Sequence, residues 1–448
     1  MCYKCRDFKT FAQTQQRRNN RSHAGVATLT EKLRRVRWLI LSLLFIATTV
    51  NYLDRAILAV LLPEIRKEIH INAAAYGNVT FWFQIAYALG SLIGGKLLDK
   101  YGTRLGYGMA AALWSIAASL NAFAGNALHF GLFRGMLGLG ESANFPACNK
   151  ASAELFPPSQ RAMVMGVVHF AANAANIIGP PFFIWIALAM GWRTCFAIIG
   201  GIGFLWVPAW LWTYRVPAQP GEPEPNAAKL SIKALLRYRQ AWGYAWAKFL
   251  TDPVWWFYLF WIPVYLNDVR HFTASQRGTA LAVIYAISGA GALLGGMISG
   301  YLINHGWGVG RSRKAVMLVC AVIMPFAALG VIAESSALAV LLFGVGMAAH
   351  AAWMTNLFTT PADVFPKQAV GVANGFGACV GALGGALFSG LIPGYVIPIT
   401  GYVPVLLTMS CFYLIAWLLV HKLMGNMAPI GAMFETRNSK LEIGNRKA

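Results

Sequence analysis

The sequence contains few charged residues. Asp, Glu, Lys and Arg together make up 12% of its 448 residues, whereas hydrophobic residues make up 57% and the mean hydropathy is +0.54. A soluble domain carries roughly 25% charged residues, because its surface has to face water. This shortage of charge excludes an ordinary soluble domain and predicts a protein whose surface mostly faces a lipid bilayer.

Among the charged residues the acidic ones are fewer, with 16 Asp and Glu against 37 Lys and Arg, so the formal net charge is +21. The basic residues gather in the tails, the short loops and the segment in the middle of the chain, and residues 1–37 hold ten of them against two acids. This is the positive-inside pattern of membrane proteins, and it predicts that both termini are cytoplasmic. Nucleic-acid binding is not expected, because no basic stripe lies on a foldable soluble domain.

Cysteine is also sparse, and its seven copies show no pairing pattern. Cys2 and Cys5 form one CxxC motif without a second pair, while a structural metal site needs about four ligands. The other five lie in apolar segments, where a free cysteine behaves as a small hydrophobic residue. We expect no metal, no cofactor and no catalytic residues. A cleavable signal peptide is not expected either, because the first apolar run begins only at residue 38 and is too long.

The sequence contains long apolar runs, and about 20 such residues cross a bilayer. The polar segment 215–241, which includes PAQPGEPEP, separates six runs from six others. We predict an all-α membrane protein with twelve transmembrane helices in two six-helix halves, 38–214 and 242–423, with cytoplasmic tails 1–37 and 424–448. The spacings Gly131/Gly135 and Gly296/Gly300 predict close helix contacts. The runs lie near 38–62, 76–98, 105–124, 128–150, 161–187, 193–214, 242–266, 279–303, 315–334, 337–360, 369–396 and 402–423.

A charged loop between the second and third runs reads GKLLDKYGTR and places Asp99, Lys100 and Arg104 around a glycine turn. Such a cluster can hold neighbouring helices in one of two arrangements. The loop resembles the signature of the major facilitator superfamily, and the resemblance implies that fold. The matching place in the second half has Arg311, Arg313 and Lys314 but lacks the acid, so a second cluster there is expected to be weaker or built differently.

The first run is interrupted by Asp54 and Arg55. A charge at the centre of a membrane helix costs about 2.5–3.5 kcal/mol on insertion scales, so such residues need a partner or a function. One interpretation is a structural ion pair that fixes helix packing. The other is that Arg55 receives an anionic solute and Asp54 takes part in proton exchange. Asn51, Asp54, Arg55 and Leu58 share one face of the predicted helix.

The fourth run carries Arg134 and Glu141, which are seven residues and about 10 Å apart along one helix face. They are too far apart to neutralise each other, so each needs a partner on another helix or in water. An acidic side chain in a low-dielectric cavity is suited to reversible protonation. Glu141 is therefore the best candidate for ion coupling, and a tie between two helices is the alternative.

Two later runs carry polar stripes, and the stripe of the fifth run could line a cavity or could form hydrogen bonds between helices. An aromatic ring beside amide and imidazole groups suits a sugar-like acid, although a single buried histidine is more often structural. The stripes consist of His169, Asn173 and Asn176 in the fifth run and of His350, Trp353 and Asn356 in the tenth.

Several longer segments resemble the anion:cation symporter family, and within it most of all the bacterial hexuronate transporters. They are NYLDR, GESANFPACNKASAELFPPSQRA, KFLTDPVWWFYLFWIPVYL and the stretch that begins GMAAHAAWMTNLF. The resemblance implies that Arg55 binds the solute carboxylate, that Asp54 and Glu141 exchange protons, and that Arg134 belongs to a family motif. It also implies that Tyr87 and Asn356 line the solute cavity.

Two positions depart from the family pattern. Sugar-acid members often have Gln where this chain has Ala172, one turn after His169, and many hexuronate members have Gln where this chain has Ala351. Both changes remove groups that bind hydroxyls.

Together these observations predict a secondary transporter, not an enzyme, that imports a sugar acid (a hexuronate or aldonate) with protons by alternating access. The solute-binding residues would be Arg55, Tyr87, His169, Trp353 and Asn356, and the protein would be a monomer in a bacterial inner membrane. A tartrate-like or aromatic acid, sodium coupling and a transporter-like solute sensor are the alternatives. Asp54, Arg55, Arg134 and Glu141 all lie in the first half, so we expect coupling there and solute shaping by uncharged groups in the second half.

Overall fold

The computed structural model describes residues 36–156, 158–214 and 232–427, which are helical almost throughout and contain no β-strand. Most of the predicted tails and of the predicted linker lies outside these ranges. The elements in chain order are a first helix Val36–Ile65, α2 Ala73–Leu120, α3 Ala127–Glu141, α4 Asn144–Leu155, α5 Pro158–Met190, α6 Trp192–Thr213, α7 Ile232–Leu235, α8 Arg239–Asp268, α9 Ala274–Asn304, α10 Val309–Ala328, α11 Ser336–Val364, α12 Lys367–Gly385, a π-helical turn η3 Ala386–Leu391, α13 Ile392–Thr400 and α14 Tyr402–Met424, with short 3-10 turns η1 Asn121–Phe123 and η2 Leu329–Val331.

Polar side chains set the beginnings of several helices. The Asn72 side chain accepts a hydrogen bond from the Ala75 N–H at the start of α2, and Thr273 with Gln276 forms a complete capping box at the start of α9. Gly102 has φ +73° and interrupts α2, so the predicted runs 76–98 and 105–124 form two rods of one continuous element. A side chain other than glycine would be strained at that φ.

Eight of the described helices are long and apolar enough to cross a membrane. The remaining four predicted crossings fall in the two rods of α2, in α3 with α4, and in α8. α2 is kinked, α3 and α4 are short, and α8 contains several Trp and Tyr together with Lys248 and Asp252, so these four crossings stay predictions. The all-helical fold itself agrees with the prediction.

Large apolar side chains cover the outside of the bundle. Leu205 is 75% exposed, Trp185 68% and Ile399 83%, although each lies within a helix that could cross a membrane. Soluble proteins rarely expose extended apolar patches, whereas lipid-facing helices do. The outer surface is therefore suited to contact with lipid.

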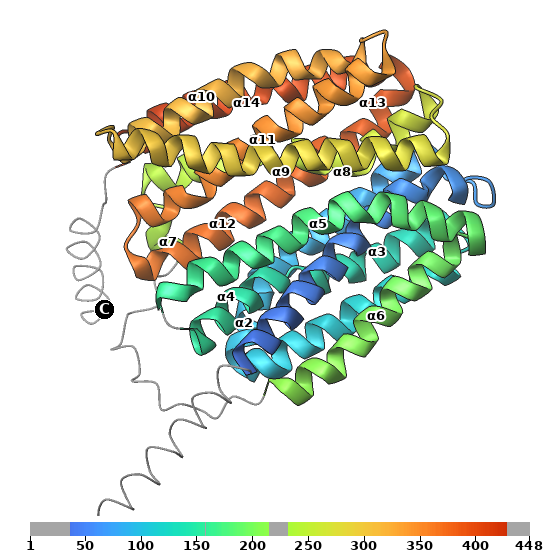
Figure 1. The fold of residues 1–448 in the computed structure, drawn as a ribbon, viewed down its shortest axis with the longest axis horizontal. Coiled ribbons are helices and arrows are strands. Elements are labelled where there is room, and N and C mark those ends of the chain that lie inside the picture. The colour runs from blue at the N-terminus through green and yellow to red at the C-terminus, as the bar shows by residue number, and fades with distance from the viewer. Residues whose placement is uncertain (1–35, 157, 215–231, 428–448) are drawn as a thin grey trace, which may run out of the picture.

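The chain forms two bundles that lie one above the other in Figure 1, the first helix to α6 below and α8 to α14 above. Within the first bundle α3 packs closely on α2, because a Cβ on Gly138 would lie 2.4 Å from the Phe83 carbonyl oxygen. The prediction that Gly131, Gly135 and Gly300 allow close helix contacts is wrong. A Cβ on any of these three glycines would meet no atom within 4 Å, so no other helix approaches them closely. In the second bundle the close contact between α9 and α11 uses Gly291 and Gly295 instead, a shift that follows from which helix face turns inward.

The two bundles are joined by polar contacts at one end of the molecule, on the right of Figure 1. We call this the far end; it holds the turns after Ile65 and after Asp268, and the opposite end, where Val36 and Met424 lie, is the terminal end. Arg277 Nη2 donates to Glu64 Oε1 at 2.6 Å and to Asn267 through Nη1 at 2.7 Å. The other hydrogen bonds between the bundles in the described residues are Arg66 to Asp268, Tyr76 to the Phe260 carbonyl, Asn78 to Tyr395, and Gln84 to Ser389.

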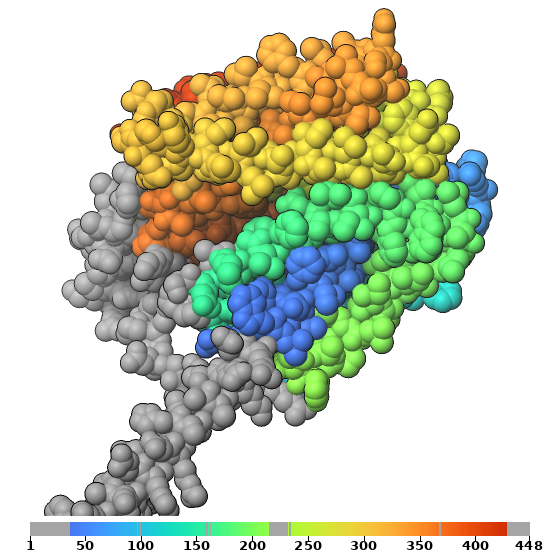
Figure 2. Space-filling view, in the orientation of Figure 1, coloured from blue at the N-terminus to red at the C-terminus, as the bar shows by residue number. Residues whose placement is uncertain are grey.

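At the terminal end, the described residues contain no hydrogen bond or ion pair between the bundles. In Figure 1, α5 and α9 converge toward the far end and diverge toward the terminal end, where α12 is visible between them. Figure 2 shows the surface hollowed there, with α12 recessed behind α9 and α5. On the face that Figure 2 shows, the two bundles are thus closed together at the far end and open at the terminal end, while α2 and α12 are in contact.

Candidate functional site

Arg55 and Glu141, both in the first bundle, form a buried ion pair. Arg55 Nε donates to Glu141 Oε2 at 2.6 Å, and the two side chains are 2% and 0% exposed. A second guanidinium nitrogen, Nη2, donates to Asn51 Oδ1 at 2.8 Å. The pair joins the first helix to the end of α3, so Glu141 has the partner on another helix that its spacing from Arg134 requires.

Aromatic rings surround the Arg55 guanidinium. Its central carbon lies 4.7 Å from the Tyr52 ring centroid, 4.8 Å from that of Tyr87 and 5.6 Å from that of Trp256. A cation is attracted to the faces of such rings. Trp256 belongs to α8, so Arg55 lies where the two bundles meet. Sequence reasoning named Tyr87 but missed Trp256, although its segment DPVWWFYLFW was singled out for the family resemblance.

Asp54 and Arg134 lie beside this pair but do not complete a second one. Arg134 Nη1 donates to the backbone carbonyl of Asp54 at 2.6 Å, and both side chains are buried. Within the described residues, neither carboxylate oxygen of Asp54 has a hydrogen-bond partner. Asp54 and Arg55 do not pair with each other, because successive helical residues point in different directions. The pair of Arg55 with Glu141 joins two helices, so the interpretation of a structural ion pair that fixes helix packing stays open for Arg55.

Several charged atoms of this cluster are buried without a partner among the described residues: both Asp54 oxygens, Glu141 Oε1, and Nε and Nη2 of Arg134. Buried polar groups in native proteins are almost always hydrogen-bonded, so these atoms are suited to a proton, water or a ligand. A small cavity, with room for about one water molecule, adjoins the cluster. It is lined by Arg55, Leu58, Tyr76, Val79, Thr80, Phe83, Arg134 and Phe260.

The polar stripe of α5 approaches this cluster through Phe145, whose ring lies 6.3 Å from that of Tyr52. His169 is exposed and its ring lies 5.1 Å from the Phe145 ring. Asn173 and Asn176 donate to the carbonyls of His169 and Ala172, four residues earlier on the same helix. The interhelical seam considered for this stripe is not formed by these bonds.

The described residues contain no group of three His, Cys, Asp or Glu side chains that could hold a metal ion.

The second-half candidates are held by neighbouring helices. The amide of Asn356 donates to the Gly295 carbonyl of α9 at 3.1 Å and to the Ala352 carbonyl at 2.9 Å, while its Oδ1 has no partner among the described residues. Trp353 is fully buried against Tyr413 of α14, which also hydrogen-bonds His350. Trp353 and Asn356 thus contact packed helices, and only the Asn356 oxygen and the Trp353 indole N–H are left available.

The expected restriction of buried charge to the first half is wrong. Lys248 of α8 is 3% exposed and Arg277 of α9 is 1% exposed. Lys248 pairs with Asp252 one turn later on the same helix. The signal was present in the sequence, since KFLTD places opposite charges four residues apart inside an apolar run, but we had used that segment only for its resemblance.

The charged loop of the first half binds backbone groups. Arg104 donates through Nε and Nη2 to the Leu211 carbonyl at 2.9 and 2.7 Å, near the end of α6. Lys100 is exposed, and its nearest ring contact is Tyr101 at 5.2 Å. The side chain of Asp99 lies outside the described part of the structure. The contacts of Arg104 hold α6 to the turn that divides α2.

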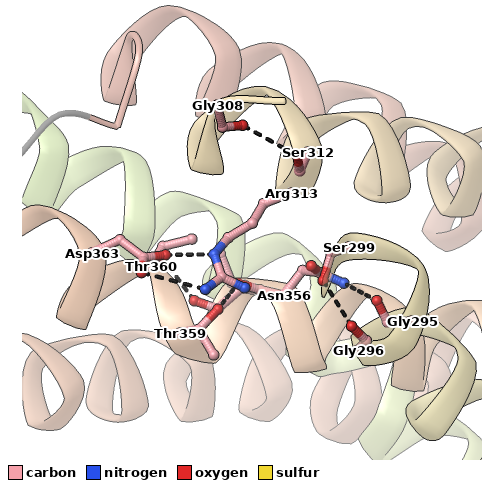
Figure 3. Close-up of polar contacts among 11 residues, drawn as sticks. Gly295, Gly296, Ser299, Gly308, Ser312, Arg313, Asn356, Thr359, Thr360 and Asp363 are labelled. Atoms are coloured by element: carbon pink, nitrogen blue, oxygen red, sulfur yellow. Dashed lines mark hydrogen bonds and ion pairs between the residues drawn. The ribbon is translucent and has the colours of Figure 1, made fainter. Parts of the chain in front are cut away.

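The second half supplies the missing acid from another helix. Arg313 of α10 pairs with Asp363 near the end of α11, beside Thr359 and Thr360 (Figure 3). The separation of 50 residues explains why the loop pattern did not reveal this partner. A cluster at this place is thus built differently from the one in the first half, as the sequence indicated.

Comparison with known proteins agrees with this architecture. The family described as Major Facilitator Superfamily matches residues 44–389. The hexuronate transporter of Escherichia coli (strain K12) is 29% identical over 426 residues, which cover 91% of this chain and 98% of that protein. The D-galactonate transporter of Escherichia coli O6:H1 is 27% identical over 427 residues, 89% of this chain and 97% of that protein.

Among solved structures, the D-xylose-proton symporter superposes with a TM-score of 0.72 at 15% sequence identity, covering 87% of this chain and 98% of that one. At this identity the likeness concerns the fold alone. The predicted family resemblance and the predicted fold are both confirmed.

Proposed function

The chain belongs to the Major Facilitator Superfamily, and we propose that it imports a sugar acid, a hexuronate or an aldonate, together with protons by alternating access. Family membership makes it a multi-pass membrane transporter rather than an enzyme. The sugar acid is suggested by the names of its relatives, which span almost the whole chain. We further propose that it resides as a monomer in a bacterial inner membrane with both termini in the cytoplasm.

The observation that carries this proposal is the buried Arg55, which is ringed by aromatic groups and bonded to Glu141. A planar guanidinium matches a carboxylate through two parallel hydrogen bonds. It is also the only arginine of the described cluster that contacts both bundles, because Trp256 lies beside it. A solute carboxylate bound there would touch both halves.

The same contact suggests how protons are coupled. Glu141 occupies Arg55 Nε, so a solute carboxylate has to compete with it. A protonated Glu141 has no negative charge and leaves Arg55 available to the solute. Asp54, whose carboxylate has no partner among the described residues, would take part in the same proton exchange.

Alternating access is supported by the contrast between the two ends of the molecule. The far end is held by Arg277 with Glu64 and by Arg66 with Asp268, while the terminal end is hollowed (Figure 2). A transporter of this design has to break the far-end contacts when it opens the other way.

Uptake into vesicles tests the proposed function directly. We expect purified protein in vesicles to accumulate a hexuronate or an aldonate when a proton gradient is imposed, and not with a sodium gradient alone. A thermal-shift screen of uronates, aldonates, tartrates and aromatic acids selects the solute, since a ligand stabilises the folded state that binds it. Binding without any uptake or counterflow would instead indicate a sensor.

The far-end ion pair provides a separate prediction. Glu64→Gln removes the charge that faces the buried Arg277, so we expect the far end to open more often. If the ion pair stabilises the closed far end by about 1.4 kcal/mol, the equilibrium between closed and open states shifts about tenfold toward the open state. A cysteine placed at Val79 in the cavity lining reports this opening through its rate of alkylation by a membrane-impermeant thiol reagent, compared with protein lacking that cysteine.

The charge-swapped variant, Glu64→Arg with Arg277→Glu, is the matched control and should restore slow alkylation. Equal alkylation rates in the Glu64→Gln protein and in the protein that keeps Glu64 and Arg277 would show that this contact does not hold the far end closed.

A further inference from the structure

The second bundle contains a buried ion pair that the proposed function does not use. Lys248 Nζ lies 2.8 Å from Asp252 Oδ2 and 3.1 Å from Oδ1, and the two side chains are 4% and 13% exposed. Both residues lie on α8, one helical turn apart. The nearest ring to the ammonium is that of Phe358 on α11, 4.4 Å from its centroid.

The charges of this pair do not link two helices. The other five ion pairs among the described residues each join two different segments of the chain, whereas this one lies within a single helix and ties nothing together. Removing two charges from water is costly, and well-packed apolar residues in their place are often neutral or stabilising. A buried pair of this kind is therefore more readily explained by binding than by stability.

The pair lies on the face of α8 that also carries Trp256, which contacts the first bundle. Lys248, Asp252 and Trp256 follow each other at four-residue intervals and share one face of α8. Trp256 lies against Arg55 and its ring is 6.0 Å from that of Tyr87, both in the first bundle. Asp252 and Lys248 lie about 6 and 12 Å from Trp256 along the helix axis, toward the hollowed terminal end.

The ion pair packs directly against the neighbouring helix α12. A Cβ on Gly381 of α12 would lie 2.0 Å from Asp252 Oδ2, and a Cβ on Gly377 would lie 2.2 Å from the Tyr244 ring and 3.0 Å from Lys248 Cδ. These two glycines are also one turn apart, so the bare face of α12 follows the ion pair. A larger side chain at Gly381 would displace the Asp252 carboxylate, and one at Gly377 would first displace the Tyr244 ring.

The chemistry of the pair fits hydroxyl groups. An ammonium donor beside a carboxylate acceptor matches a hydroxyl, which both donates and accepts, and vicinal hydroxyls can use the two groups together. The pair has no net charge, so it gives no attraction to a second solute carboxylate.

We propose that Lys248 and Asp252 bind the hydroxyl groups of the solute whose carboxylate is held by Arg55. This inference rests on the proposed function, because it takes the solute to be a sugar acid. The site then has two poles, a charged one in the first bundle that selects acids and a neutral polar one in the second that selects hydroxylated acids.

The test compares a hexuronate with cyclohexanecarboxylate, which has a similar ring and carboxylate but no hydroxyls. Binding to purified protein is measured for the wild type and for Lys248→Met with Asp252→Leu, which keeps the volume and removes the charges. We expect the double variant to lose about 30-fold in hexuronate affinity, as for hydrogen bonds to charged groups, and to keep its affinity for cyclohexanecarboxylate.

The pair Lys248→Gln with Asp252→Asn keeps neutral donors and acceptors and is expected to lose only a few-fold, about threefold to fivefold. It also decides the matter if the apolar variant does not fold. Unchanged hexuronate affinity in both double variants would overturn the inference and leave the proposed function intact. If the wild type binds no hexuronate or aldonate, the proposed function fails and the inference fails with it.

Discussion

Replacing Arg55 by lysine is expected to reduce solute affinity and uptake at least about a hundredfold, the equivalent of 2.7 kcal/mol. The guanidinium bonds Glu141 through Nε and Asn51 through Nη2 while its plane lies among Tyr52 and Tyr87. A lysine ammonium is a point charge that can replace neither the paired geometry nor the contact with the rings. Binding of the solute found in the thermal-shift screen and its counterflow in vesicles measure the effect.

Arg193→Lys is the matched control for this change. Arg193 lies at the start of α6, and its guanidinium contacts the Trp192 ring. Its side chain is 46% exposed, unlike the buried Arg55. We expect its effect on uptake to stay within about twofold, as for surface substitutions. A protein with Arg55→Lys that binds the solute as tightly as the wild type would remove Arg55 from the carboxylate-binding role.

Replacing Glu141 by glutamine is expected to abolish proton-driven accumulation while solute binding and counterflow continue. Glutamine resembles the protonated carboxyl and carries no negative charge, so the Arg55 guanidinium is always available to the solute carboxylate. Solute affinity should then be independent of pH, whereas in the wild type it should fall as the pH rises, because ionised Glu141 takes the Arg55 Nε. The measurements are accumulation under an imposed proton gradient, counterflow without one, and solute affinity in acidic and alkaline buffer.

Glu334→Gln makes the same chemical change on an exposed residue and should accumulate solute like the wild type. Proton-driven accumulation that survives Glu141→Gln would exclude this residue as the coupling group. The same experiment on Asp54→Asn would then decide whether the second buried acid carries the proton instead.

Much of the architecture could be predicted because its causes are local. Apolar runs of about 20 residues, the polar segment 215–241 and the loop charges around Gly102 each depend on a short stretch of sequence. The boundaries were less predictable. Two runs form the continuous α2, and the fourth run is divided into α3 and α4 between Glu141 and Asn144, details that depend on how these helices pack on each other.

The candidate site was predicted as a set of residues but not as an arrangement. Arg55 and Glu141 were both named, yet their contact across 86 positions could not be read from spacing. Arg313 was noted as lacking an acid, and Asp363 supplies it from 50 positions away. Lys248 and Asp252 differ from these pairs, because their four-residue spacing in the sequence is enough to indicate an ion pair within one helix. We did not predict this pair from the sequence.

The sequence by itself determined that this is a helical membrane protein of two halves and which positions carry charge inside it. The cost of charge in lipid and the period of the helix act over a few residues, so both leave a local pattern. Only the tertiary structure decided that Glu141 rather than Asp54 bonds Arg55, that Trp256 of the second half lies beside it, and that the far end is closed. Those outcomes depend on how each helix is rotated against its neighbours, and no short stretch of sequence records that rotation.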